Sequence, residues 1–171
     1  QLGNNYCSAA CCMYGMKEAV IAKEHTPIKL DAKIFFMDMR SYGKEFDAYY
    51  ERAQGEYGVQ FVRSRVAGVT EDPKTNNLFV HCVGDETPKT EEFDMVILAT
   101  GMQPPKNIEK LAKTLKIKLN KYDFCETGAF SPVETSKRGI FVCGAFSAPK
   151  DIPESVAQAS GAAAKAMSII A

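Results

Sequence analysis

The chain has 171 residues, of which 46% are hydrophobic and 25% charged, and its 21 basic side chains balance its 21 acidic ones. This composition is typical of a globular protein with room for one domain or two small lobes. It lacks the charge excess of a protein that binds nucleic acid or a membrane surface, and no apolar run reaches the length of about 18 residues that spans a membrane. The first residues also lack the order of a signal peptide. We therefore expect a cytoplasmic protein whose six cysteines form no disulfides.

The first half of the chain is expected to contain two helices and several strands. Apolar residues recur at helical spacing over residues 8–24 and again over 44–57, which predicts a helix in each segment. Shorter apolar runs predict strands, and a polar turn between two of them predicts an antiparallel hairpin. The expected strands cover residues 33–37, 59–63, 65–70 and 78–83, the hairpin turn covers 71–77, and a charged turn covers 84–92.

The second half is expected to begin where a strand over residues 93–101 enters a glycine turn. A short helix over 108–115, a buried strand over 139–144 and a long helix over 153–170 should follow. Because strands alternate with helices, the predicted fold class is α/β with an inserted antiparallel hairpin. We place a boundary between two lobes at the glycine turn, so that they cover residues 1–100 and 101–171.

Three cysteines near the start form the strongest local motif. Cys7, Cys11 and Cys12 follow the pattern C-x3-C-C, with two of them about one helical turn apart at the expected N-terminus of the first helix. The partial positive charge of a helix N-terminus stabilises thiolates, so three sulfur ligands could converge on one metal centre. An iron–sulfur cubane needs four ligands, so a fourth would have to come from outside this chain.

Other interpretations of the cysteines stay open at this point. The three could be small core residues of a helix. A zinc site that recruits His25 is disfavoured, because at 1.5 Å per residue this histidine would lie about 27 Å from Cys7 along the helix. The other cysteines, Cys82, Cys125 and Cys143, stand alone in apolar surroundings and are expected to be core thiols.

Two further stretches suggest that the backbone approaches a cofactor. VILATGMQP, residues 96–104, ends a strand in a turn of small residues, although an ordinary strand and turn would look the same. GIFVCGAFSAPKDIPESVAQAS, residues 139–160, leads from a strand through a glycine into a helix, whose free N–H groups could bind an anionic group. Its alternative is a strand, loop and helix that only pack the core. The sequence contains neither a G-x-G-x-x-G motif nor a P-loop.

The sequence resembles one known family over nearly its whole length, from Tyr6 to Ala166. The stretches that carry the resemblance are YCSAACCMYGMKEAVIAKEH, IFFMDMRSYGKEF with YYERA, FDMVILATGMQP, and FSPVETSKRGIFVCGAFSAPKDIPESVAQASGAAAKA. They are similar to the iron–sulfur flavoprotein A subunit of heterodisulfide reductase and to the related A subunit of the quinone-interacting membrane-bound oxidoreductase complex. This resemblance implies a thioredoxin-reductase-like FAD/NAD(P)-binding fold. The first lobe would correspond to the NAD(P) domain and the second to the C-terminal part of the FAD domain.

The resemblance also implies which residues hold cofactors. Cys7, Cys11 and Cys12 match three ligands of a [4Fe–4S] cluster, whose fourth ligand lies upstream of this chain. They occupy the place of the NAD(P) glycine motif of related enzymes, so the usual NAD(P) site is expected to be lost. Where a typical reductase has G-D, this sequence has Gly144-Ala145. The flavin-contacting residues implied are Thr100, Gly101, Gly144, Ala145, Lys150, Ile152, Pro153, Glu154, Ser155 and Val156.

The implied function is that of an oxidoreductase subunit that passes electrons between FAD and [4Fe–4S] clusters in anaerobic energy or sulfur metabolism. Its partners would be other subunits of a heterodisulfide-reductase-like or quinone-interacting complex, with a homodimer as a further form of assembly. No side chain is expected to act as a general acid or base. Because Gln1 is not an initiator residue, we expect the chain to be a fragment that is inactive in isolation.

Two other classes of function are weighed against this one. An NAD(P)H-dependent disulfide reductase would need a glycine fingerprint in place of CSAACC and a redox-active C-x-x-C, and the sequence has neither. A cofactor-free or zinc-stabilised interaction module is the non-enzymatic alternative.

Overall fold

The computed structural model describes residues 4–83 and 87–170. Within them the chain divides into two compact units: residues 11–100 form one, and residues 4–10 join residues 101–170 in the other. The assignment of an NAD(P)-like lobe to residues 1–100 and of part of an FAD domain to residues 101–171 stays a prediction. Helices and strands alternate over residues 11–63 and are mixed over the remaining described residues, in keeping with the predicted α/β class.

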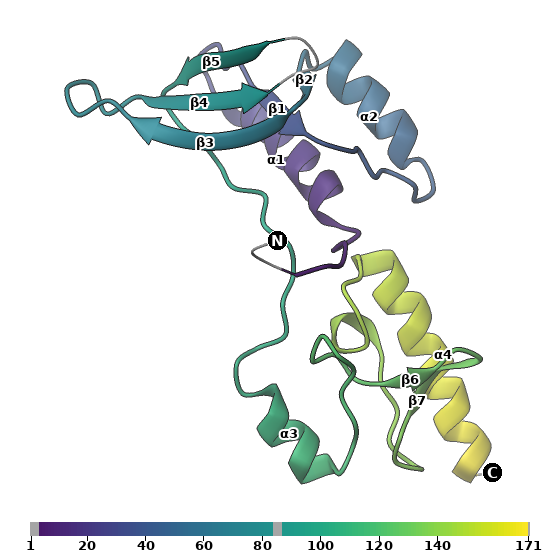
Figure 1. Ribbon diagram of the computed structural model, residues 1–171. Helices are drawn as coiled ribbons and strands as arrows, with labels where there is room; N and C mark the ends of the chain where they lie inside the picture. Colours follow the sequence, from purple (N-terminus) through teal and green to yellow (C-terminus); the bar gives the residue numbers. More distant parts are fainter. Residues whose placement is uncertain (1–3, 84–86, 171) are drawn as a thin grey trace. The chain divides into compact units, whose positions relative to one another are not determined.

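The unit of residues 11–100 contains two helices packed near a short parallel strand pair (Figure 1). The helices are α1, Cys11–His25, and α2, Phe46–Gly55. The strands are β1, Lys33–Phe36, and β2, Gln60–Arg63, which pair in parallel from Lys33 with Gln60 to Phe36 with Arg63. Val20, Ala53 and Val59 are buried together between these elements. Each of the two helices therefore buries part of the apolar face that its sequence predicts, as an amphipathic helix does.

A three-stranded antiparallel sheet follows in the same unit, in the order β3-β4-β5 (Figure 1). The strands are β3, Arg65–Glu71, β4, Leu78–Val83, and β5, Pro88–Phe93. The expected hairpin is therefore confirmed, but the charged turn predicted for residues 84–92 is wrong from residue 88 onward, and residues 84–86 lie outside those described. The charges of β5 suit an edge strand, which pairs on one side and presents polar groups to water.

The other unit is built from α3, Ile108–Leu115, a short hairpin and α4, Ile152–Ile170. The hairpin consists of β6, Thr127–Gly128, and β7, Ser131–Thr135, and a 3-10 turn, η1, covers Gly144–Phe146. Both helices begin and end within one residue of their predicted bounds. The buried residues of this core are Ala112, Ile117, Cys125 and Val142.

Two predicted strands are absent from the structure. Residues 94–100 carry no strand, and the side chain of Leu98 is 74% exposed. The segment 139–144 contributes an isolated bridge from Phe141 to Glu134 and part of η1. Both segments are apolar, which led to the prediction, but a strand exists only where a neighbouring strand accepts its backbone hydrogen bonds. Within the described residues no strand pairs with residues 94–100, and the segment 139–144 bonds to β7 only over residues 140–142, which is too short for a named strand.

Among the helices of the described residues, none combines the length and the apolar character needed to cross a membrane.

Candidate functional site

Cys7 lies in a tight turn just before α1 and not on the helix itself. Ala9 has a left-handed backbone, with φ of 57°, which an L-residue adopts at some cost and which stops the helix from extending back to residue 8. The turn aims the N–H of Ala9 at the Cys7 sulfur, 3.3 Å away. The expectation that Cys7 and Cys11 stand one helical turn apart is therefore wrong, because α1 begins at Cys11.

Cys11 and Cys12 are the first two residues of α1, and both side chains are half-buried. The Cys12 thiol lies 3.9 Å from the carbonyl oxygen of Asp38, which follows β1. None of the six cysteines is in a disulfide, as the sequence predicted. In the part of the chain that the structure describes, no three histidine, cysteine or acidic side chains already form a group that could hold a metal ion.

The other cysteines divide into two kinds. Cys82 and Cys125 are buried, which confirms the prediction of core thiols, whereas Cys143 is exposed, so the prediction is wrong for it. Cys143 directly precedes η1 in the segment where the predicted strand does not form. Burial raises the pKa of the Cys125 thiol above its ordinary value of 9.0, with a smaller contribution from Glu126.

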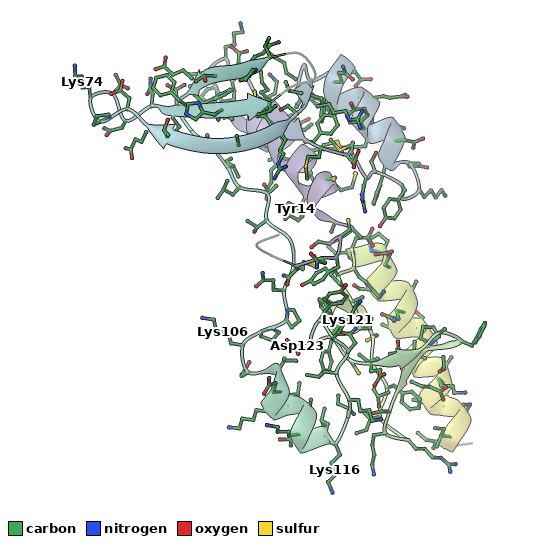
Figure 2. The ribbon with its side chains drawn as sticks, in the orientation of Figure 1. Tyr14, Lys74, Lys106, Lys116, Lys121 and Asp123 are labelled. Carbon is green, nitrogen blue, oxygen red and sulfur yellow. The ribbon has the colours of Figure 1, made fainter. Side chains whose placement is uncertain are left out.

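The backbone at Thr100 is held by Tyr14, which projects from α1 and is labelled in Figure 2. The phenol O–H of Tyr14 donates to the carbonyl oxygen of Thr100. Burial raises the pKa of Tyr14, with further contributions from Cys11, Glu18 and Cys12, so the hydroxyl keeps its proton and remains a donor. Sequence reasoning missed Tyr14, because a tyrosine on a helix carries no signal that it binds a distant backbone.

Further along the same stretch, Met102 is held by two residues that flank Cys7. The N–H of Met102 donates to the hydroxyl of Ser8 at 2.7 Å, and the carbonyl of Met102 accepts from the hydroxyl of Tyr6 at 2.9 Å. Gly101, which the resemblance assigns to the flavin, lies directly against Ser8. Neither Tyr6 nor Ser8 was selected from the sequence, since both are separated from Met102 by more than 90 residues.

The loop at Gly144 is closed by Gln158 of α4. Gly144 is buried and has φ of 66°, a conformation that favours glycine. Its N–H donates to the side-chain oxygen of Gln158 at 2.8 Å, which also accepts from the Ser147 hydroxyl at 3.0 Å. Ala145 is exposed in η1, and Lys150 is half-buried before α4. Gln158 therefore positions the loop, a role that sequence reasoning did not assign.

The N-terminus of α4 is capped by its own side chains. The N–H of Glu154 donates to the Asp151 carboxylate at 2.8 Å, and the Glu154 carboxylate accepts from the N–H of Asp151 at 3.1 Å. This reciprocal pair is a capping box. Pro153 has no N–H, so the expected row of free N–H groups is not present at Pro153 and Glu154. Two carboxylates at this end also disfavour a phosphate there.

The predicted residues suit the implied cofactors to different degrees. The cysteines supply three sulfur donors, and the sulfur of one of them already accepts a backbone N–H, as sulfur ligands of iron–sulfur clusters commonly do. Near the start of α4, Ile152 is 80% and Val156 61% exposed, in the segment that follows the buried Gly144. These apolar side chains suit the face of an aromatic ring better than a charged group.

A comparison with protein families finds one match over most of the chain. The sequence profile of the pyridine nucleotide-disulphide oxidoreductase family matches residues 13–163. That range includes Thr100, Gly101, the Gly144 loop and the start of α4. It begins after Cys12, so the cysteine motif lies outside the matched region.

Curated relatives match the chain from end to end. An iron–sulfur A subunit of CoB–CoM heterodisulfide reductase from Methanopyrus kandleri is 41% identical over 98% of this chain, and one from Methanocaldococcus jannaschii is 42% identical over 95%. The A subunit of an H2:CoB-CoM heterodisulfide, ferredoxin reductase from Methanothermobacter thermautotrophicus is 39% identical over 97%. The chain spans 26%, 25% and 26% of the lengths of these proteins, about a quarter of each.

Proposed function

The chain belongs to the pyridine nucleotide-disulphide oxidoreductase family, and from that membership we propose that it is the cofactor-binding part of an A subunit like that of heterodisulfide reductase. In this role it passes electrons between FAD and a [4Fe–4S] cluster. The observation that carries the proposal is the cysteine motif, Cys7, Cys11 and Cys12, at the start of a chain about 40% identical to proteins named as iron–sulfur subunits.

Cys7, Cys11 and Cys12 would hold the cluster, with a fourth ligand from outside the chain. When bound, a [4Fe–4S] cluster accepts and releases one electron at a time. The chain's own contribution is to supply thiolates and to set their electrostatic surroundings. The N–H of Ala9 points at the Cys7 sulfur. Cys11 and Cys12 begin α1, where the positive end of the helix dipole would favour an anionic cluster.

The flavin would lie against the turn at Thr100 and Gly101 and the loop that leads into α4. When bound, FAD supplies both one-electron and two-electron chemistry. Gly144 and Ala145 would let the backbone approach it, and Lys150 would add a positive charge. The remaining contacts would come from the first turn of α4, residues 152–156. The exposed side chains of Ile152 and Val156 support this assignment, because an aromatic ring would bury them.

The whole protein would act in the cytoplasm together with other subunits of a heterodisulfide-reductase-like complex. The balanced charge of the chain supports partners of protein rather than nucleic acid. No residue of the chain is assigned as an acid or base, since the redox chemistry belongs to the cofactors.

Anaerobic isolation of the full-length protein, followed by metal and sulfide analysis, tests the proposal. We expect iron, sulfide and a broad absorption at about 400 nm. Cys11→Ser should remove most of this absorption, whereas Cys143→Ser, which changes an exposed cysteine outside the motif, should retain it. Zinc in place of iron, or equal absorption in the two variants, would contradict the proposal.

A further inference from the structure

The two neighbours of Cys7 bind the two ends of one residue's backbone. Tyr6 donates its O–H to the carbonyl of Met102, and the Ser8 hydroxyl accepts the N–H of the same residue. Cys7 lies between them and is itself exposed. The position of its sulfur therefore depends on how firmly Tyr6 and Ser8 are held. All of these residues belong to one compact unit.

Both anchors are packed against the body of that unit. The ring of Tyr6 meets the rings of Tyr122 and Phe124 edge to face, with centroids 5.0 and 5.5 Å apart. Ser8 is only 4% exposed, although serine is a polar residue that prefers the surface. A buried hydroxyl is stable only where it is hydrogen-bonded. The bond with Met102 provides that partner.

Gly101 leaves the space that the Ser8 hydroxyl occupies. A Cβ atom at this position would lie 2.5 Å from the Ser8 oxygen but 3.6 Å from the Ser8 Cβ. The first distance is a clash and the second is ordinary contact. The backbone of Gly101 does not have the positive φ that would by itself require glycine. Residue 101 is thus glycine because the hydroxyl of Ser8 occupies the space that a side chain would need.

The anchor extends to the cysteine through a short turn. The N–H of Ala10 donates to the carbonyl of Ser8 at 2.7 Å, and Ala9 adopts the left-handed conformation that points its N–H at the Cys7 sulfur. A shift of Ser8 would move this turn and change the hydrogen bond to the sulfur. Hydrogen bonds to ligand sulfurs are among the factors that set the potential of an iron–sulfur cluster.

We propose that Ser8 is a positioning residue for Cys7: its buried hydroxyl fixes the cysteine turn on Met102, and Gly101 is required because that hydroxyl needs the space. The inference rests on the proposed function, in which Cys7 is a cluster ligand. It ties the cluster ligand to the same turn that is assigned to the flavin. A substitution at Gly101 then acts on Cys7 through Ser8.

The test uses the full-length protein with its cofactors and five variants, of which Cys7→Ser removes the thiol itself. Ser8→Ala removes the acceptor, Gly101→Ala displaces it, and in the double variant the added methyl group no longer meets a hydroxyl. Ser136→Ala is the matched control, because its hydroxyl also accepts a backbone N–H, that of Lys118, at 2.8 Å. The readouts are hydrogen exchange of the amides of Ala9 and Met102, the EPR signal of the reduced cluster and its midpoint potential.

We expect exchange at both amides to become about fivefold faster in Ser8→Ala, as loss of one hydrogen bond implies. The EPR signal and the potential should shift with it. Gly101→Ala should have a similar effect, and the double variant should be no worse than the more affected single variant. Ser136→Ala should match the wild type in every readout.

Two outcomes overturn the inference, and a third separates it from the proposed function. Wild-type exchange and EPR in Ser8→Ala would overturn it, and so would additive effects in the double variant. Either result leaves the cluster assignment intact if Cys7→Ser still lowers the iron content. Unchanged iron in Cys7→Ser would instead overturn the assignment of Cys7 as a ligand, and with it the role of Ser8.

Discussion

The antiparallel sheet β3-β4-β5 and the apolar segment of residues 94–100 follow one another in the chain, yet only the sheet is complete. Each strand of the sheet pairs with a strand that is close to it in the sequence. Between β4 and β5 the register runs without a break from Leu78 with Phe93 to Val83 with Pro88. The segment that follows is apolar, but Met95, Ile97 and Leu98 are all at least 70% exposed. Antiparallel strands joined by a short turn pair with their neighbours in the sequence. A strand of a parallel sheet instead needs a partner strand that lies far away in the sequence.

The same contrast separates the helices. Met16 of α1 is completely buried, in the unit that contains the complete sheet. Met167 of α4 is 68% exposed, and other apolar residues along that helix are also exposed. An apolar surface of this kind is buried in most proteins by another element. The two methionines thus differ in how completely the described residues cover them.

The largest expected effect comes from truncating the two methionines in turn. Met16→Ala should lower the free energy of unfolding by roughly 2–5 kcal/mol, because it leaves a cavity in a packed core. Met167→Ala should change it by less than about 0.5 kcal/mol, the usual effect of a surface substitution. Urea unfolding followed by circular dichroism measures both values. Equal losses in the two variants would break the comparison between the buried methionine of α1 and the exposed one of α4.

A smaller effect is expected from adding a methyl group to a glycine in each unit. Gly144→Ala should destabilise the chain by roughly 1–2 kcal/mol, since an L-residue at φ of 66° is strained. Gly55→Ala, in α2, should instead stabilise it by up to about 1 kcal/mol, because no atom lies within 4 Å of the new methyl and alanine favours a helix. Thermal melts of the two variants should shift in opposite directions, and a shift in the same direction would contradict the difference in backbone strain between the two glycines.

Asp151→Ala should have an effect of about 1 kcal/mol, the usual contribution of a helix N-cap. The loss should be confined to the start of α4, where the carboxylate accepts the N–H of Glu154. Hydrogen exchange of the first turn of α4 should therefore become faster while exchange in α1 stays constant. Asp151→Asn, which retains a cap acceptor, should restore most of the protection.

The smallest effect concerns alkaline pH and Cys125. Burial raises the pKa of this thiol in the folded chain, so the folded state prefers the protonated form. Below pH 9 both states keep the proton and the stabilising contribution is complete. As the pH rises toward the raised pKa, the unfolded chain ionises first and this contribution is lost. Cys125→Ala should weaken the decline in unfolding free energy above pH 9, and an unchanged pH profile would argue against burial as its cause.

The sequence predicted the elements that depend on local patterns. The spacing of Met16 and Val20 predicted α1, and the polar turn after β3 predicted the hairpin. It missed β5, because the charged residues of this strand resemble those of a surface turn. The start of α1 was also misplaced, because the left-handed conformation of Ala9 is set by its surroundings and not by alanine's own preference.

For the candidate site, the sequence supplied residue types but not their contacts. The cysteine motif was visible as a pattern, whereas the roles of Ser8 and Tyr14 depend on hydrogen bonds to residues 86 or more positions away. No periodicity or spacing in the sequence indicates a hydrogen bond between residues that are so far apart. Cys143 was misjudged for a related reason, since its burial was inferred from a strand that the described residues do not form.

The capping box of α4 bears on how much ordering a bound cofactor would require. Asp151 and Glu154 satisfy each other's backbone groups without help from a bound molecule. The start of α4 at Ile152 is therefore defined by the chain itself, so a cofactor would meet a helix end whose backbone is already ordered. Binding would then cost little ordering entropy at this end of the helix. The start of α4 would then need no rearrangement of its cap when a cofactor binds beside it.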